Sequence, residues 1–123
     1  MPGTEVVTVF VTAPGKEPAL ALARQVVEES LAACGNVIPN VTSVFRWDEK
    51  VNVEEEVLLM LKTSTVKSPA LIARVAELHT YEVPEVLSVP VEDGFGPYLD
   101  WVHECTSGEA PPAPSVEKFD GRQ

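Results

Sequence analysis

The chain has 123 residues, of which 45% are hydrophobic, and this is enough for one folded domain with its own core. Its formal net charge is −10, from 19 acidic and 9 basic residues, which repels a phosphate backbone and makes a nucleic-acid partner unexpected. No stretch approaches the ~18 consecutive apolar residues that can span a bilayer, so we expect no membrane partner either.

The first residues and the cysteines bear on location. Met1–Glu5 lacks the basic start of a secretion signal, and the apolar stretch behind it is only as long as a strand. Cys34 and Cys105 are far apart in the sequence, and without an export signal we expect both to be reduced. The expected location is the cytoplasm.

The first half of the chain predicts a strand, a helix and a long hairpin. Glu5–Ala13 is apolar on both faces, as a central strand is. Lys16–Ala33 carries an apolar stripe at helical spacing and is predicted to be a helix. The strands Val37–Trp47 and Val57–Leu61 flank a polar turn at Asp48–Lys50. The hairpin arms are about ten residues long, against a usual ~5–6, so they need a partner surface beyond the core of one small domain.

The second half predicts a helix, a strand and a short helix. Ser68-Pro69 begins the second helix, with Ser at the N-cap and Pro in the first turn. Val86–Val91 is the fourth strand, and Pro97 begins a short C-terminal helix that ends at Ser107-Gly108. We therefore expect one domain over residues 1–105 and a Pro-rich tail over residues 106–123.

The prolines select the strand order. Proline cannot donate to a sheet ladder, so Pro39 in the second strand and Pro90 in the fourth place these strands at the edges. With right-handed crossovers, this predicts an α+β ferredoxin-like β-α-β-β-α-β sandwich with antiparallel sheet order 4-1-3-2. The helices are expected to cover one face only. The other face would expose apolar strands, which favours an oligomer.

Enzyme signatures are missing from the sequence. It contains no G-x-S-x-G, H-E-x-x-H or C-x-x-C motif. Gly15-Lys16 is followed by Glu17, where a phosphate-binding loop needs Ser or Thr, so that motif is rejected too. The run Glu54–Glu56 is expected to be a solvated strand entrance rather than a metal site. We expect a protein that is not an enzyme.

Two residues are candidate metal ligands. His79 ends the second helix, where a histidine is either a structural cap or a ligand. Cys34 lies at a helix-to-strand junction and is either a small buried hydrophobe or a soft ligand. Thiolate and imidazole together suit copper or zinc rather than magnesium or calcium. Cys105, on the last helix, is expected to be a bystander.

Other polar and aromatic residues give weaker candidates. Lys62 follows the apolar third strand and either holds an anionic ligand or ends the strand with a charge. Glu82 is a carboxylate that could complete a metal shell beside His79. A further group of aromatic residues either lines a cleft or packs at an interface, and the interface is the commoner role for them: Trp47, Tyr81, Tyr98 and Trp101.

Several motifs in order resemble the CutA family of divalent-cation tolerance proteins. They are ACGNVIPNVTSVFRW, EEEVLLMLKT, HTYEVPEVLSVPV and YLDWV, and the resemblance extends over Val6–Val102. It implies a homotrimer whose sheets pack around a threefold axis, copper or another divalent cation as the bound ion, and Cys34 and His79 as the copper ligands. Gly35, Glu49 and Thr80 depart from the family pattern, which puts local packing and turn shape in doubt rather than ligand identity.

Two other functions remain open. The fold also resembles that of the nitrogen-regulatory PII proteins, which sense small ligands in clefts between subunits, but the short turn at Asp48–Lys50 argues against the long loop of those proteins. A third possible function is that of a rigid scaffold, in which metal binding is incidental.

The predicted sheet sets the geometry of the metal site. Cys34 opens the second strand and His79 precedes the fourth, and we expect both residues at one end of the sheet, on opposite edges. Three strand spacings of ~4.8 Å separate these edges by about 14 Å. A metal bond is only ~2.0–2.3 Å long, so a shared site would have to lie between two subunits.

Overall fold

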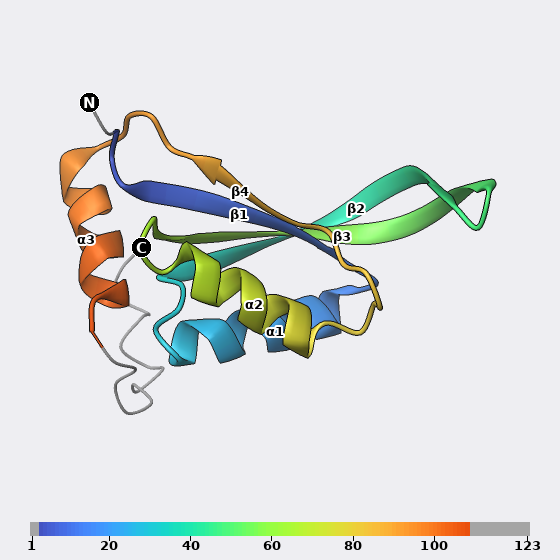
Figure 1. Ribbon diagram of the computed structural model, residues 1–123, viewed down its shortest axis with the longest axis horizontal. Coiled ribbons are helices and arrows are strands. Elements are labelled where there is room, and N and C mark those ends of the chain that lie inside the picture. The colour runs from blue at the N-terminus through green and yellow to red at the C-terminus, as the bar shows by residue number, and fades with distance from the viewer. Residues whose placement is uncertain (1–2, 109–123) are drawn as a thin grey trace.

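The structure, a computed structural model, describes residues 3–108. Residues 109–123, which form most of the predicted tail, lie outside the described residues. The elements follow the predicted order (Figure 1): β1 Val6–Ala13, α1 Lys16–Glu28, β2 Cys34–Trp47, β3 Lys50–Ser64, α2 Ser68–Leu78, β4 Val86–Pro90 and α3 Gly96–Thr106. None of the helices in residues 3–108 is long and apolar enough to cross a membrane.

The strands form a sheet in the order β2-β3-β1-β4, and each neighbouring pair is antiparallel. This is the predicted order 4-1-3-2 and a ferredoxin-like α+β fold. Pro39 and Pro90 lie in β2 and β4, the two edge strands, where a missing backbone donor disturbs the ladder least.

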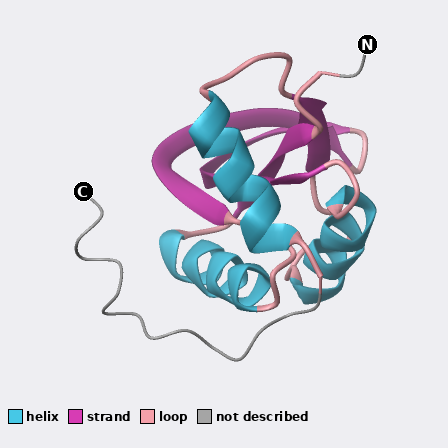
Figure 2. Ribbon diagram, turned by 90° about the vertical axis from the view of Figure 1, so that its left-hand side faces the viewer, coloured by secondary structure: helices cyan, strands magenta, loops and turns pink. Residues whose placement is uncertain are grey.

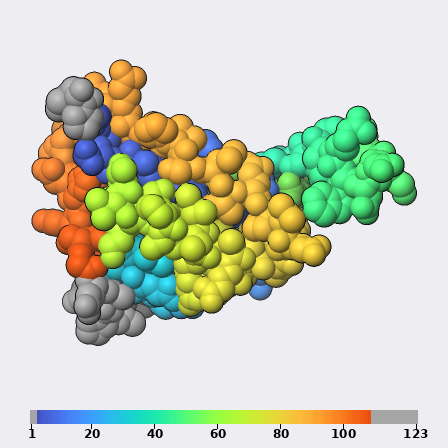
Figure 3. Space-filling model, in the orientation of Figure 1, coloured from blue at the N-terminus to red at the C-terminus, as the bar shows by residue number. Residues whose placement is uncertain are grey.

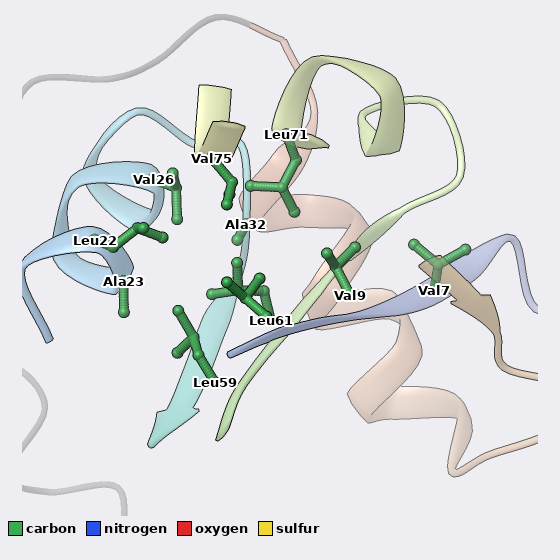
Figure 4. Packing of buried hydrophobic residues seen from close by; sticks show 11 residues of the cluster. Val7, Val9, Leu22, Ala23, Val26, Ala32, Leu59, Leu61, Leu71 and Val75 are labelled. Atoms are coloured by element: carbon green, nitrogen blue, oxygen red, sulfur yellow. The ribbon is translucent and has the colours of Figure 1, made fainter. Parts of the chain in front are cut away.

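The core lies between the sheet and the helices α1 and α2, which cover one face together (Figures 1 and 2). Alternate residues of β1 and β3 face these helices, because successive side chains of a strand point to opposite faces. Figure 4 shows Val9, Leu59 and Leu61 pointing toward Val26 and Leu71. At the rim, Arg74 of α2 donates to Glu29, at the end of α1, through two nitrogens at 2.8 and 2.9 Å.

The first helix is shorter than the predicted Lys16–Ala33. It ends at Glu28, and Ser30 adopts a left-handed conformation (φ 61°) that a right-handed helix cannot continue through. The N–H of Ala33 then donates to the carbonyl of Lys62 on β3 (2.8 Å). Residues 31–33 are helix-compatible by composition, but they are needed to bring the chain back to the sheet.

The third helix corrects the expectation that helices cover one face only. Val6 shares the face of Thr8 and Phe10, opposite the core, and is only 2% exposed because α3 packs on it. Val102 of α3, Val6 and Ala33 form a separate buried cluster. Figure 1 shows α3 lying across one end of the sheet. The second face is therefore covered at that end.

The rest of the second face is apolar and uncovered by the described residues, and we call it the open sheet face. Strand register places its side chains together on neighbouring strands. It consists of three half-buried residues, Phe10, Leu58 and Met60, and three exposed ones, Ile38 (39%), Val89 (42%) and Leu87 (55%).

The hairpin of β2 and β3 projects well beyond the body of the molecule (Figure 3). Its strands have 14 and 15 residues, longer than the predicted arms. The turn is Asp48-Glu49, with φ of 57° and 62°, and Lys50 already pairs with Trp47. Two successive left-handed residues are typical of the two-residue hairpin turn that matches the strand twist.

Candidate functional site

The predicted site residues fall into two groups at opposite ends of the sheet. Cys34 pairs with Lys62, which pairs in turn with Thr8 of β1. His79 instead contacts the carbonyl of Thr12, four residues further along β1, or about 13 Å at ~3.3 Å per residue. The expectation that Cys34 and His79 share one end of the sheet is wrong. Three antiparallel pairings in succession make β2 and β4 run in opposite directions.

The side chain of Cys34 lies on the same side of the sheet as the open sheet face. It lies at the edge of that face, where α3 crosses the sheet. Its thiol is half-buried, and Sγ lies 3.4 Å from the hydroxyl oxygen of Tyr98 on α3. Directly across the ladder, the ammonium of Lys62 donates to the side-chain oxygen of Asn36. Cys34 and Lys62 are therefore brought together as neighbours on adjacent strands.

Cys105 also belongs to this end of the molecule. Tyr98, Trp101 and Cys105 are spaced i, i+3 and i+7 and so lie on one side of α3. The rings of Tyr98 and Trp101 pack at a tilt of 39° with their centroids 5.6 Å apart, and Cys105 packs against the cluster that contains Ala33. Burial, the charge of Glu104 and the nearby Cys34 raise the pKa of the Cys105 thiol. Both thiols are free.

Cys105 was expected to be a bystander on the last helix, and the structure places it half-buried against the cluster of Val6, Ala33 and Val102. The helical spacing of Tyr98, Trp101 and Cys105 is visible in the sequence, but nothing in the sequence says which strand they face.

His79 is the C-cap residue of α2, and both nitrogens of its ring are hydrogen-bonded to backbone groups outside the helix. Nε2 lies 2.7 Å from the carbonyl oxygen of Thr12, which can only accept, so Nε2 carries the proton. Nδ1 accepts the backbone N–H of Tyr81 at 3.0 Å. The imidazole is thus a neutral ring that joins β1 to the loop after α2. In this arrangement neither nitrogen has a lone pair directed at a metal ion.

Tyr81 continues this chain of hydrogen bonds to β3. Its hydroxyl donates to Oε2 of Glu56 at 2.7 Å, and its ring packs on His79 at 4.7 Å between centroids. Burial, the hydrogen bond to Glu56 and the charges of Glu56 and Glu54 raise the pKa of Tyr81 to about 12. Glu54 and Glu55 are exposed, as expected of a solvated strand entrance, but Glu56 is only 8% exposed, which corrects that expectation for this residue.

A groove of about 830 Å³ opens between the outer half of the hairpin, nearer its turn, and the loop after α2. Tyr81 and Glu82 line it from the loop, and Arg46 and Trp47 line it from β2. Glu54, Glu56 and Glu85 add further carboxylates, so the groove is acidic on balance. It brings Tyr81 and Glu82 together with His79 nearby, and leaves Cys34 and Lys62 at the other end.

Nowhere in residues 3–108 do three or more His, Cys, Asp or Glu side chains gather in a metal-binding arrangement. Within that part of the chain, Cys34 and His79 are therefore candidate ligands without a complete shell.

The described residues form a small α+β protein with a four-stranded antiparallel sheet, an open apolar face, a projecting hairpin and a free thiol beside that face. The family profile described as CutA1 divalent ion tolerance protein matches residues 7–105, and the chain belongs to this family.

Curated relatives carry the same description. The chain is 48% identical to the mouse protein CutA over 106 residues, which covers 86% of this chain and 59% of the mouse protein. It is 45% identical to the divalent-cation tolerance protein CutA of Thermus thermophilus over 98 residues, covering 80% of this chain and 95% of that protein. The chain thus spans well under two thirds of the mouse and human relatives and nearly all of the bacterial one.

Solved structures agree in fold. The divalent cation tolerance protein from Thermus thermophilus superposes with a TM-score of 0.80 at 43% identity, covering 83% of this chain and 99% of that one. CutA from Xylella fastidiosa gives a TM-score of 0.82 at 35% identity, covering 84% and 99%.

Proposed function

We propose that this chain is a non-catalytic homotrimer that binds divalent metal ions, copper above all, and thereby supports tolerance to them. Membership of the divalent ion tolerance family supports the metal part of the proposal. The observation that carries it is the half-buried Cys34 thiol, a soft ligand set beside the open sheet face and not taken up by a disulfide. The two free thiols also favour a reducing compartment, and we propose the cytoplasm.

Self-association is supported by the open sheet face. Contiguous apolar surface of this kind marks an interaction site in a protein that is stable in water. The long hairpin offers a second surface, because its arms carry exposed Val44, Val51 and Val53 far from the core of the same subunit. A trimer that packs these faces together buries both surfaces.

The copper ligands we propose are Cys34 and, from a neighbouring subunit, His79. Their separation within one subunit requires two subunits for a shared ion. His79 must also release one of its two hydrogen bonds, to Thr12 or to Tyr81, before a ring nitrogen can bind metal. Glu82 or water completes the shell. Such a release has a cost in stability, so copper binding at His79 should loosen the loop after α2.

Mixing two variants tests the shared site. Cys34→Ser and His79→Gln chains, each expected to bind copper weakly, are unfolded and refolded together. Mixed trimers should recover part of the binding, because some interfaces then pair an intact cysteine with an intact histidine. Full binding by His79→Gln alone would remove His79 from the site. No recovery in trimers whose mixed composition is shown by mass would reject the shared site.

A second candidate is a ligand-sensing trimer of the PII kind, favoured by the groove of about 830 Å³ lined by Tyr81 and Glu82. Its size suits a small molecule. Lys62 lies at the end of the sheet that holds Cys34, away from this groove. It is therefore a candidate contact for an anionic group only if a neighbouring subunit places its own groove beside Lys62. Small metabolites that raise the melting temperature of the wild-type chain but not of a Tyr81→Phe, Glu82→Gln variant would support this function over metal binding alone.

A further inference from the structure

Glu56 is a buried carboxylate that no cation meets. It is only 8% exposed, and its Oε2 accepts the hydroxyl of Tyr81 at 2.7 Å. Its other oxygen, Oε1, has no hydrogen bond to a described residue. Every buried side-chain oxygen in residues 3–108 has a partner, so Oε1 is not fully covered and faces the groove that Glu56 lines. Because burying a charge is costly unless it is paired and hydrogen-bonded, this oxygen marks a place for a cationic donor.

The groove itself does not supply that cation. Its described lining holds four carboxylates and a single basic group, the guanidinium of Arg46. Strand alternation puts Arg46 on the opposite face of the hairpin from Glu54 and Glu56. Arg46 also makes no ion pair with a residue that the structure describes. The negative charge of the groove is therefore left for a ligand.

The carboxylates are spaced for an extended cation rather than a single metal ion. No group of three or more His, Cys, Asp or Glu side chains in the described part of the chain could hold a metal. Glu54 and Glu56 share one face of β3 and are two residues apart, or about 6.6 Å at ~3.3 Å per residue. Two ammonium groups joined by four methylenes span about 6 Å, because five bonds of ~1.5 Å separate the nitrogens.

Aromatic side chains line the groove beside these carboxylates. Phe45 and Trp47 are 39% and 49% exposed, and both line the groove together with Tyr81. Strand register puts Phe45 on the same face of the hairpin as Glu54. Aromatic faces attract ammonium groups and bury methylene groups at the same time. This combination suits an aliphatic amine better than a hydrated inorganic cation.

We propose that the groove binds an aliphatic diamine or polyamine. One primary ammonium donates to Oε1 of Glu56, the next pairs with Glu54, and the methylene chain packs on the aromatic side chains. A quaternary ammonium does not fit, because it has no N–H to donate to Glu56. This inference goes beyond metal binding, and it gives a ligand class to the groove on which the second candidate function rests.

Calorimetric titration of the full chain with 1,4-diaminobutane at physiological salt tests the proposal. We expect saturable binding of one diamine per subunit. Glu56→Gln keeps an oxygen that can accept from Tyr81 but removes the charge. It should weaken binding about 10–100-fold, which is the usual effect of losing a hydrogen bond to a charged group. No saturable binding by the wild type, or unchanged affinity in Glu56→Gln, would overturn the site.

The matched control is Glu55→Gln. It removes the same charge from the neighbouring residue, whose side chain lies on the opposite face of the hairpin and accepts the hydroxyl of Thr42. This variant should bind the diamine as the wild type does. Equal losses in Glu55→Gln and Glu56→Gln would mean unspecific attraction to an acidic protein, and the proposed site would be wrong.

A ligand series tests the chemistry without any variant. Butylamine has one ammonium instead of two, and the fully N-methylated diamine has no N–H. Each should bind at least about 10-fold more weakly than 1,4-diaminobutane. Magnesium carries the same charge as the diamine and should not displace it. Equal binding of butylamine or of magnesium would contradict the two-carboxylate arrangement.

A second copy of the chain is the competing occupant, because Glu54 and Glu56 lie on the same side of the sheet as the open sheet face. A crystal structure of the assembly soaked with 1,4-diaminobutane distinguishes the two. Diamine density at Glu56 supports the proposal, and a neighbour's Lys or Arg side chain at Glu56 overturns it.

Failure of the proposed metal function is separately visible. Cys34→Ser should weaken copper binding and leave diamine binding unchanged, since Cys34 lies at the other end of the sheet. Diamine binding by a wild-type chain that takes up no copper contradicts the metal function alone. Copper uptake without diamine binding contradicts this inference alone.

Discussion

At the scale of single residues, His79 shows how one side chain can be read in two ways. A histidine at the end of a helix within a family signature indicates a ligand, yet both ring nitrogens here hold backbone groups of Thr12 and Tyr81. The hydrogen-bonded imidazole of His79 fixes the loop after α2, which lines the groove. The two hydrogen bonds give His79 a structural role. To bind a metal ion, the ring would have to break one of them.

Gly35 is a residue whose missing side chain matters. A Cβ at this position would lie 2.9 Å from Cδ2 of Leu61 and 3.3 Å from Cβ of Ala23, both in the buried core. We expect Gly35→Val to destabilise the fold by about 1–3 kcal/mol through overpacking. Urea unfolding measures this change. Wild-type stability in Gly35→Val would mean that β2 can move away from α1 at no cost.

Tyr81 should make stability fall at alkaline pH. Its pKa rises from about 10 in the unfolded chain to about 12 in the fold, so the fold favours the neutral phenol. The stability that Tyr81 contributes is fully present below the pKa of the unfolded chain, about 10. It is lost as the pH rises through the pKa of the folded chain, about 12. Urea midpoints compared between pH values near 10 and near 12 should therefore fall more for the wild type than for Tyr81→Phe. An equal fall in both chains would contradict the assignment.

At the scale of elements, the hairpin turn is not optimised. Glu49 has φ of 62°, a conformation that costs a side-chain-bearing residue about 1–2 kcal/mol and glycine almost nothing. We expect Glu49→Gly to stabilise the chain by about 1 kcal/mol, after the added flexibility of the unfolded state is subtracted. The control is Lys50→Gly, one residue later in the strand, which should destabilise it. Thermal unfolding of both variants provides the comparison.

At the scale of the whole molecule, the open sheet face should decide assembly. Leu87 is 55% exposed in the single chain and lies at the edge of this face. Leu87→Lys places a charge in the proposed interface, where an unpaired buried charge is costly. We expect the wild type to sediment as one species of threefold mass and Leu87→Lys to dissociate.

The matched control for assembly is Val66→Lys, a highly exposed residue in the turn before α2. It should leave the mass of the assembly unchanged. A monomeric wild type at micromolar concentration, or a Leu87→Lys variant that sediments as the wild type does, would contradict burial of this face.

The amino-acid sequence by itself determined the order of elements, the edge strands and the ferredoxin-like sheet. These features depend on local signals: the apolar period of Val6–Ala13, the proline at the start of α2, and the missing donors of Pro39 and Pro90. Even the opposite directions of β2 and β4 were implied, because a hairpin and two right-handed crossovers require them. The expectation of one shared end overlooked that consequence.

The tertiary structure alone decided where the candidate residues meet. The turn at Ser30 ends α1 early and delivers Ala33 and Cys34 to the sheet, where Val102 and Tyr98 of α3 pack against them. Glu56 is buried under Tyr81 although it stands in a run of three charges. Such contacts join residues tens of positions apart, and no periodicity in the sequence encodes which distant surface a half-buried side chain will face.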